Sequence, residues 1–206
     1  DLEYRSIERG RLAILKGTAL DDLQQKPARA FEASVKALSN FGFKIKEIEI
    51  DEVESALALS SLVYPSEAYA EWKDKIEAAP ELMYGKILQR FRGGKDVLAS
   101  DYLKAMRDLK IFKKQYAAKC SEFDGVILPT CPIMPPNLER LESDNDYYVS
   151  QNLMALRNTR IGNLMGICSL TIPTNYNSCG LSIMALPNRE EKLLRLGKAA
   201  EMAILK

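Results

Sequence analysis

The stretch RLAILKGTALDDLQQKPARAFEASVKALSNFGFKIKEIEI, residues 11–50, decides the fold. It opens with a short apolar run, RLAILK, that is typical of a β-strand. Apolar residues then recur at helical spacing, with Asp21 or Asp22 available as the N-cap and Gly42 as the stop. The segment 43–50 is rich in β-forming residues that partly alternate. Strand, helix and strand in this short span predict a βαβ unit with parallel strands.

Helices and strands continue along the rest of the chain. Further helices are expected over residues 52–64, from 66 after a break at Pro65, 80–91, 100–123 with Ser100 as cap, 147–164 and 190–205. Further strands are expected over 124–130, 168–173 and 181–186. The acidic segment 139–146 is expected to be a solvated loop, because it lacks the glycine and terminal glutamate of a calcium-binding EF-hand. The chain is therefore predicted to be α/β, a mixed sheet of about five strands covered by helices, and residues 1–206 to be a single domain.

The composition is that of a globular protein. Hydrophobic residues make up 47% of the 206 residues, charged residues 28%, and the formal net charge is +1. This balance argues against a nucleic-acid binder. No apolar run approaches the roughly 18 residues of a membrane helix, so no membrane partner is expected. The chain has no histidine, which excludes Ser-His-Asp catalysis, Cys-His catalysis and His-ligated zinc.

Cysteine usage indicates a reducing compartment. The four cysteines, at 120, 131, 168 and 179, form no C-x-x-C motif, so we expect free thiols in a cytoplasmic protein, and no metal or cofactor. No secretory leader is visible, and the start at Asp1 reads as the interior of something longer.

Basic residues are the first candidates for binding. A stripe on the helix 100–123 fits a solvated face better than an RNA-binding surface: Lys104, Arg107, Lys110 and Lys114. Four arginines suit carboxylates, either of a substrate or in internal ion pairs: Arg90, Arg92, Arg157 and Arg160. Phosphate-loop motifs and the G-x-S-x-G nucleophile elbow are absent from the sequence.

Six stretches keep the motif order and spacing of one family. They are SEAYAEWKDK (66–75), LQRFRGGKDVLASDYLKAMRDLK (88–110), EFDGVILPTCPIMPP (122–136), NTRIGNLMGICSLTIPT (158–174), CGLSIMALP (179–187) and EEKLLRLGKAAE (190–201). Together they resemble the C-terminal half of the amidase signature family. The earlier RLAILKG with LDDL looks like the strand and helix that follow that family's signature region, so the resemblance covers nearly the whole chain.

The resemblance implies hydrolysis or transfer of a carboxamide group. The family's catalytic unit is a serine nucleophile, a bridging cis-serine and a lysine that moves protons through it, with backbone N–H groups as the oxyanion hole. This chemistry needs no histidine and no cofactor. It lies in a Gly/Ser-rich stretch of the family's N-terminal half, for which this sequence has no counterpart. We therefore assign no catalytic residue and expect the isolated chain to be inactive.

The resemblance also implies that this half lines part of the substrate funnel. The predicted substrate-binding residues are Arg90, Arg157, Thr159 and Asn163. Hydrogen bonding to loop backbone is an equally good role for Thr159 and Asn163. Two positions depart from the family: Leu156 replaces a carboxylate of the glutamyl-tRNA amidotransferase branch, and Ser182 replaces the proline of a common G-L-P pattern. The amide substrate is therefore left open.

Three hypotheses follow for the chain as a whole. The first is the C-terminal portion of an amidase, whose partners are the missing catalytic half and a small amide; an apolar face exposed by that absence predicts self-association. The second is a separate noncatalytic binding module of the same fold. The third is an unrelated α/β ligand-binding domain, in which residues 168–173 and 181–186 need not be neighbouring strands.

Overall fold

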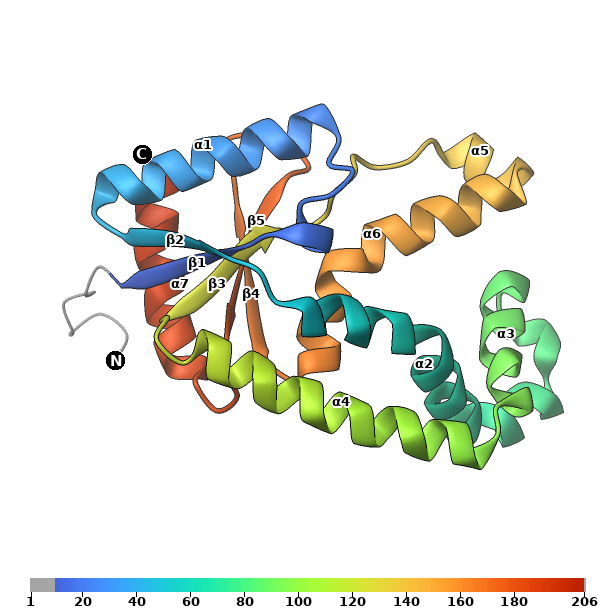
Figure 1. Ribbon diagram of the computed structural model, residues 1–206. Helices are drawn as coiled ribbons and strands as arrows, with labels where there is room; N and C mark the ends of the chain where they lie inside the picture. The colour runs from blue at the N-terminus through green and yellow to red at the C-terminus, as the bar shows by residue number, and fades with distance from the viewer. Residues whose placement is uncertain (1–9, 206) are drawn as a thin grey trace.

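The computed structural model describes residues 10–205, which form one mixed sheet with helices on both faces (Figure 1). The strands are β1 (Arg11–Leu15), β2 (Lys44–Ile48), β3 (Gly125–Pro129), β4 (Cys168–Pro173) and β5 (Gly180–Ala185), in the order β2-β1-β3-β5-β4. The α-helices are α1 (Gln25–Phe41), α2 (Asp51–Ala78), α3 (Gly85–Arg92), α4 (Ala99–Cys120), α5 (Leu138–Ser143), α6 (Asn145–Met165) and α7 (Glu190–Ile204). Short 3-10 turns are η1 (Gly17–Ala19), η2 (Pro80–Leu82) and η3 (Gly93–Asp96). The predicted α/β class with five strands is confirmed.

The βαβ unit is present as predicted. β1 pairs in parallel with β2, in register from Arg11 opposite Lys44 to Leu15 opposite Ile48. Gly42 ends α1 in the left-handed conformation, at φ 111°, where its N–H donates to the Leu38 carbonyl. The predicted aspartate cap of α1 is wrong. After β1 the chain makes η1 and a turn with Asp22 at φ 51°, so the helix begins only at Gln25.

The other half of the sheet is antiparallel. β5 pairs with β3 on one side and with β4 on the other. Residues 168–173 and 181–186 are therefore neighbouring strands, as the amidase resemblance requires and the hypothesis of an unrelated domain does not. The Thr130 N–H donates to the Gly180 carbonyl at 2.9 Å. Pro129 and Leu181 therefore occupy a non-hydrogen-bonded register position, which suits a proline because it has no N–H to donate.

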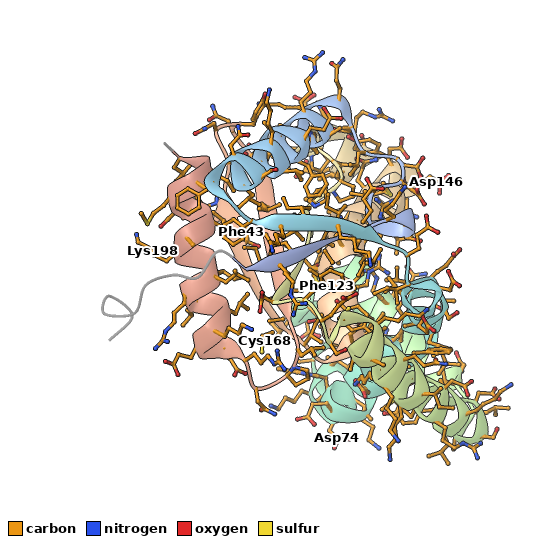
Figure 2. The ribbon with its side chains drawn as sticks, turned by 60° about the vertical axis from the view of Figure 1, so that its left-hand side comes forward. Phe43, Asp74, Phe123, Asp146, Cys168 and Lys198 are labelled. Carbon is orange, nitrogen blue, oxygen red and sulfur yellow. The ribbon has the colours of Figure 1, made fainter. Side chains whose placement is uncertain are left out.

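Two apolar layers hold the helices to the sheet. α2, α4 and α6 cover one face, around a cluster that includes Tyr116, Val126 and Leu164, and α1 and α7 cover the other. Phe43 and Phe123, which are 4% and 7% exposed, lie beside the strands in Figure 2, whereas Lys198 lies at the periphery. Between residues 10 and 205, no helix is both long and apolar enough to cross a membrane.

The helical region between β2 and β3 differs from the prediction. The expected break at Pro65 is wrong, because α2 runs unbroken from Asp51 to Ala78 with that proline inside it. A proline removes one helical hydrogen bond but does not end a helix whose two halves are held by packing. Here η3 packs on α2, and Gly94 lies directly against the Pro65 carbonyl.

Helix starts are the other corrections. Residues 80–82 form only a 3-10 turn, so α3 begins later, at Gly85. Ser100 is not the cap of α4, which begins at Ala99. The expected acidic loop is instead α5 and the start of α6, because Asn137 accepts from the Arg140 N–H and Asp144 accepts from the Tyr147 N–H, each at 2.9 Å.

Candidate functional site

Three of the four predicted substrate-binding residues lie on α6, and the helix presents them on different faces. Arg157 and Asn163 are six residues apart, which is about 240° around an α-helix. Arg157 is accordingly buried, whereas Thr159 and Asn163 are exposed. The helical spacing of the sequence already separates these residues, so they cannot all contact one small substrate.

The buried face of α6 anchors the helix to the sheet. Asn158 is fully buried, and its Nδ2 donates to the carbonyls of Ala19 at 3.0 Å and Pro129 at 2.7 Å. Arg157 Nη2 donates to the Asp21 carbonyl at 2.5 Å, and its Nε donates to Asn158 Oδ1 at 3.3 Å. Burial lowers the pKa of Arg157. Arg157 therefore stabilises the fold behind the site. The contacts of Asn158 tie η1 to the end of β3.

Asn158 is not among the residues predicted from the sequence, although the sequence carries a signal for it. It falls in line with Met154, Ile161 and Met165, at the spacing of an apolar helix face. A polar side chain in an apolar stripe is normally buried and hydrogen-bonded. The helical spacing within residues 154–165 thus predicts that Asn158 is buried and hydrogen-bonded.

The opposite face of α6 is apolar and exposed. Val149, Leu153 and Leu156 are 41%, 46% and 44% exposed and recur at helical spacing. Asn163 continues this line of residues with a polar side chain. Thr159 lies one turn before Asn163, and its Oγ1 donates to the Leu156 carbonyl of the same helix. We call Val149, Leu153 and Leu156 the α6 apolar stripe.

Two arginines flank this stripe. Arg90 of α3 donates from Nη1 to Asn152 Oδ1 at 2.8 Å, which ties α3 to α6. Arg160 donates from Nη2 to the Leu153 carbonyl at 2.6 Å and from Nη1 to Ser60 Oγ of α2 at 3.4 Å. The two arginines are close enough to interact electrostatically. We call Arg90 and Arg160 the arginine pair.

The arginine pair has no acidic partner in the part of the chain that the structure describes. The ion pairs within residues 10–205 include Arg92 with Glu77, at 2.6 Å, but not Arg90, Arg157 or Arg160. Burial lowers the pKa of Arg160, and the neighbouring Arg90 lowers it further. Two guanidinium groups near enough to influence each other, with no carboxylate ion-paired to either, favour a bound anion or carbonyl oxygen.

Tyr64 of α2 lies beside the same cluster. Burial raises the pKa of its phenol, while nearby Arg160 and the Asn163 side chain act in the opposite direction. The structure therefore brings Arg90 and Asn163 of the predicted set together with Arg160 and Tyr64. The sequence pointed to Arg160 as a carboxylate-binding candidate, but nothing in the sequence marked Tyr64.

A second polar cluster lies on the sheet. Thr130 Oγ1 and Ser182 Oγ are 2.8 Å apart, and Thr171 Oγ1 is 3.3 Å from each of them. Ser182 is the residue that replaces the family's proline. Among the described residues, no lysine or carboxylate hydrogen-bonds to these hydroxyls, so the cluster lacks the base that a serine nucleophile needs.

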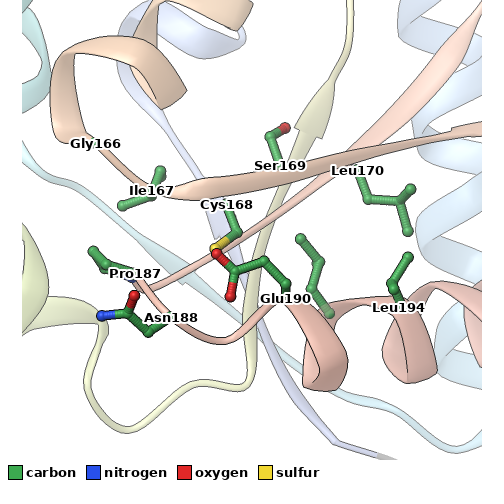
Figure 3. A pocket seen from close by; sticks show the side chains of 10 residues that line it. Gly166, Ile167, Cys168, Ser169, Leu170, Pro187, Asn188, Glu190 and Leu194 are labelled. Carbon is green, nitrogen blue, oxygen red and sulfur yellow. The ribbon is translucent and has the colours of Figure 1, made fainter.

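Two grooves of the structure do not coincide with the predicted site. One, of about 520 Å³, lies between the start of β4, where Ser169 is found, and the N-terminus of α7, where Glu190 is found (Figure 3). The other, of about 820 Å³, runs along α1 past Phe31 and Val35. None of the four predicted residues lines either groove. The α4 stripe of Lys104, Arg107, Lys110 and Lys114 is exposed.

Comparison with known proteins places this fold and its motifs in a family. The model of the Amidase family matches residues 3–194. The chain is 27% identical over 190 residues to 2-amino-5-chloromuconic acid deaminase of Comamonas testosteroni, covering 89% of this chain and 41% of that protein. It is 27% identical over 198 residues to an amidase of Pseudomonas putida, covering 94% and 42%. The chain thus spans less than half the length of these curated relatives.

Solved structures share the fold. Allophanate hydrolase of Kluyveromyces lactis superposes with a TM-score of 0.83 at 18% identity, over 95% of this chain and 32% of that one. The A subunit of the Thermotoga maritima glutamyl-tRNA(Gln) amidotransferase superposes with a TM-score of 0.70 at 19% identity, over 92% and 41%. With the family match across most of its length, the chain belongs to the amidase family.

Proposed function

We propose that this chain is the C-terminal portion of a cytoplasmic amidase that hydrolyses the C–N bond of a small, non-peptide carboxamide. Family membership and the two relatives of known name support an amide-cleaving parent protein. The chain aligns with only about two fifths of the length of each of those relatives, which supports its being a portion of a longer protein. In this proposal the chain contributes scaffold and one wall of the substrate funnel.

The proposed reaction uses groups outside this chain. A serine of the missing half attacks the carboxamide carbon, a lysine moves the proton through a bridging serine, and backbone N–H groups hold the oxyanion. Among the described residues, no serine hydroxyl hydrogen-bonds to a lysine; Ser34, Ser60 and Ser66, for example, donate to carbonyls of their own helices. The isolated chain is therefore proposed to be inactive.

The position of the arginine pair beside the exposed face of α6 is the main support for a substrate-facing role of this region. Arg90 and Asn163, with Thr159 next to them, would contact an amide that enters between α3 and α6. Arg157 would act indirectly, because its buried guanidinium donates to the Asp21 carbonyl. The role proposed for Arg157 is thus positioning rather than contact.

The reading frame upstream of the Asp1 codon tests the proposal. A Gly/Ser-rich signature segment in frame would support a two-part amidase. A start codon close to Asp1 would instead support the second candidate, a separate noncatalytic module that binds a partner chain. The α6 apolar stripe favours either of these over a lone monomer, because contiguous exposed apolar surface is typical of interfaces.

The α6 apolar stripe predicts self-association of the isolated chain. Changing both Leu153→Glu and Leu156→Glu should weaken self-association by about tenfold or more, since each buried leucine is worth roughly 1.5–3 kcal/mol. Sedimentation equilibrium of both proteins would measure the change. Leu103→Glu on α4 is the matched control, because Leu103 is also exposed, at 59%. A monomeric wild-type chain at high concentration would count against this prediction.

A further inference from the structure

Two cysteines, Cys131 and Cys179, lie just beyond the paired ends of β3 and β5. The register runs from Val126 opposite Met184 to Pro129 opposite Leu181. It continues for one more residue pair, because the Thr130 N–H donates to the Gly180 carbonyl at 2.9 Å. The next residues in this register are Cys131 and Cys179. Neither the family match nor the proposed substrate-binding role gives these two cysteines a function.

The position in the ladder suits a covalent link. Thr130 and Gly180 are a hydrogen-bonded pair, so the pair that follows is non-hydrogen-bonded, with side chains on the same side of the sheet. Cα atoms at such positions are about 4.5 Å apart. Disulfides span Cα separations of about 4.4–6.8 Å. A ladder that keeps this register for one more residue pair would bring Cys131 and Cys179 within that range.

The surroundings of the two thiols support the same pairing. Cys179 Sγ lies 3.8 Å from Met134 Sδ, on the loop that begins at Cys131. Burial raises the pKa of Cys179, and nearby Cys131 raises it further, so the two thiols interact. Both side chains are partly exposed, which leaves them open to small reagents.

The other two cysteines are placed differently. Cys120 is buried in the core, and burial raises its pKa to about 11, so it is poorly nucleophilic. Cys168 lies on β4 opposite Ala185, and its Sγ donates to the Leu186 carbonyl. Of the four cysteines, all within the described residues, only Cys131 and Cys179 lie at matching positions just beyond the ends of two paired strands.

We propose that Cys131 and Cys179 are a redox modification site, at which a low-molecular-weight disulfide oxidises the pair to a reversible disulfide bond. One protein thiolate attacks the reagent, forming a mixed disulfide and releasing one reagent thiol. The second protein thiolate attacks the protein sulfur of that mixed disulfide, forming the Cys131–Cys179 bond and releasing the second reagent thiol. Two protein thiols are oxidised and one reagent disulfide is reduced. The bond fixes the β4–β5 turn to the loop after β3.

Oxidised glutathione is the probe. After oxidation, denaturation and alkylation with N-ethylmaleimide, mass spectrometry should find two alkyl groups on the wild-type chain instead of the four expected from its cysteines. Dithiothreitol should restore all four. Cys168→Ser, the matched control, should still form the bond, whereas Cys131→Ser and Cys179→Ser should form none.

Peptide mapping makes the test independent of how the variants fold. Cleavage after Glu122, after Glu142 and after Tyr176 places each of the four cysteines in a different fragment, and the linked peptides should contain Cys131 and Cys179. Four alkyl groups after oxidation, glutathione adducts as the only end product, or a link between other cysteines would each overturn the proposal.

Discussion

Replacing Asn158 by leucine is expected to lower the free energy of unfolding by roughly 2–5 kcal/mol. The side chain is fully buried and donates to the Ala19 and Pro129 carbonyls. Leucine has a similar size but no donor, so it leaves two buried carbonyls without their partner, at a cost of roughly 1–3 kcal/mol each. It also removes the acceptor of the Arg157 Nε. Urea unfolding followed by circular dichroism measures the change.

The neighbouring residue provides the control. Thr159 is exposed, and its hydroxyl contacts only the carbonyl of Leu156 on the same helix. Thr159→Ala should change stability by no more than about 0.5 kcal/mol, as is usual for surface substitutions. If Asn158→Leu were as mild as Thr159→Ala, the anchoring of α6 by Asn158 would be wrong.

Gly94→Ala should destabilise the chain by roughly 2–4 kcal/mol. A Cβ at this position would lie 2.0 Å from the Pro65 oxygen, which is backbone and cannot rotate away as a side chain can. The contact between η3 and α2 would have to open, and this contact braces α2 where Pro65 has removed a helical hydrogen bond. Thermal and urea unfolding should both show the loss.

Gly93 is a matched control one residue away. A Cβ at Gly93 meets nothing within 4 Å, and its φ of −59° is ordinary for alanine. Gly93→Ala should therefore be neutral or stabilise by up to about 1 kcal/mol, through a less flexible unfolded chain. Equal effects of the two substitutions would contradict the close packing of Gly94.

These two positions also show where sequence reasoning reached its limit. The strands and α1 follow from local patterns, because alternation, helical spacing and Gly42 act within a few residues of each other. The passage of α2 through Pro65 depends on η3, which is far along the chain and packs against it. No local pattern contains that contact, so the sequence predicted a break.

The candidate site divides in the same way. Motif order in the sequence predicted the family, and the family match confirmed it. Arg90 and Arg160 lie near each other where a hydrogen bond from Arg90 to Asn152 joins α3 to α6. Such a contact between distant helices is set by tertiary packing. Arg157 was grouped with them by residue type and lies one turn from Arg160, but its guanidinium is buried and donates to the Asp21 carbonyl, a tertiary contact that the sequence does not contain.

Carboxamide turnover is the measurement that tests the central claim most directly. The purified chain and the protein encoded by its whole reading frame should be assayed side by side on a panel of small carboxamides, with ammonia release as the readout. We predict turnover by the whole protein and none above background by the chain alone. Turnover by the chain alone, at a rate comparable with the whole protein, would contradict the claim that the nucleophile lies outside it.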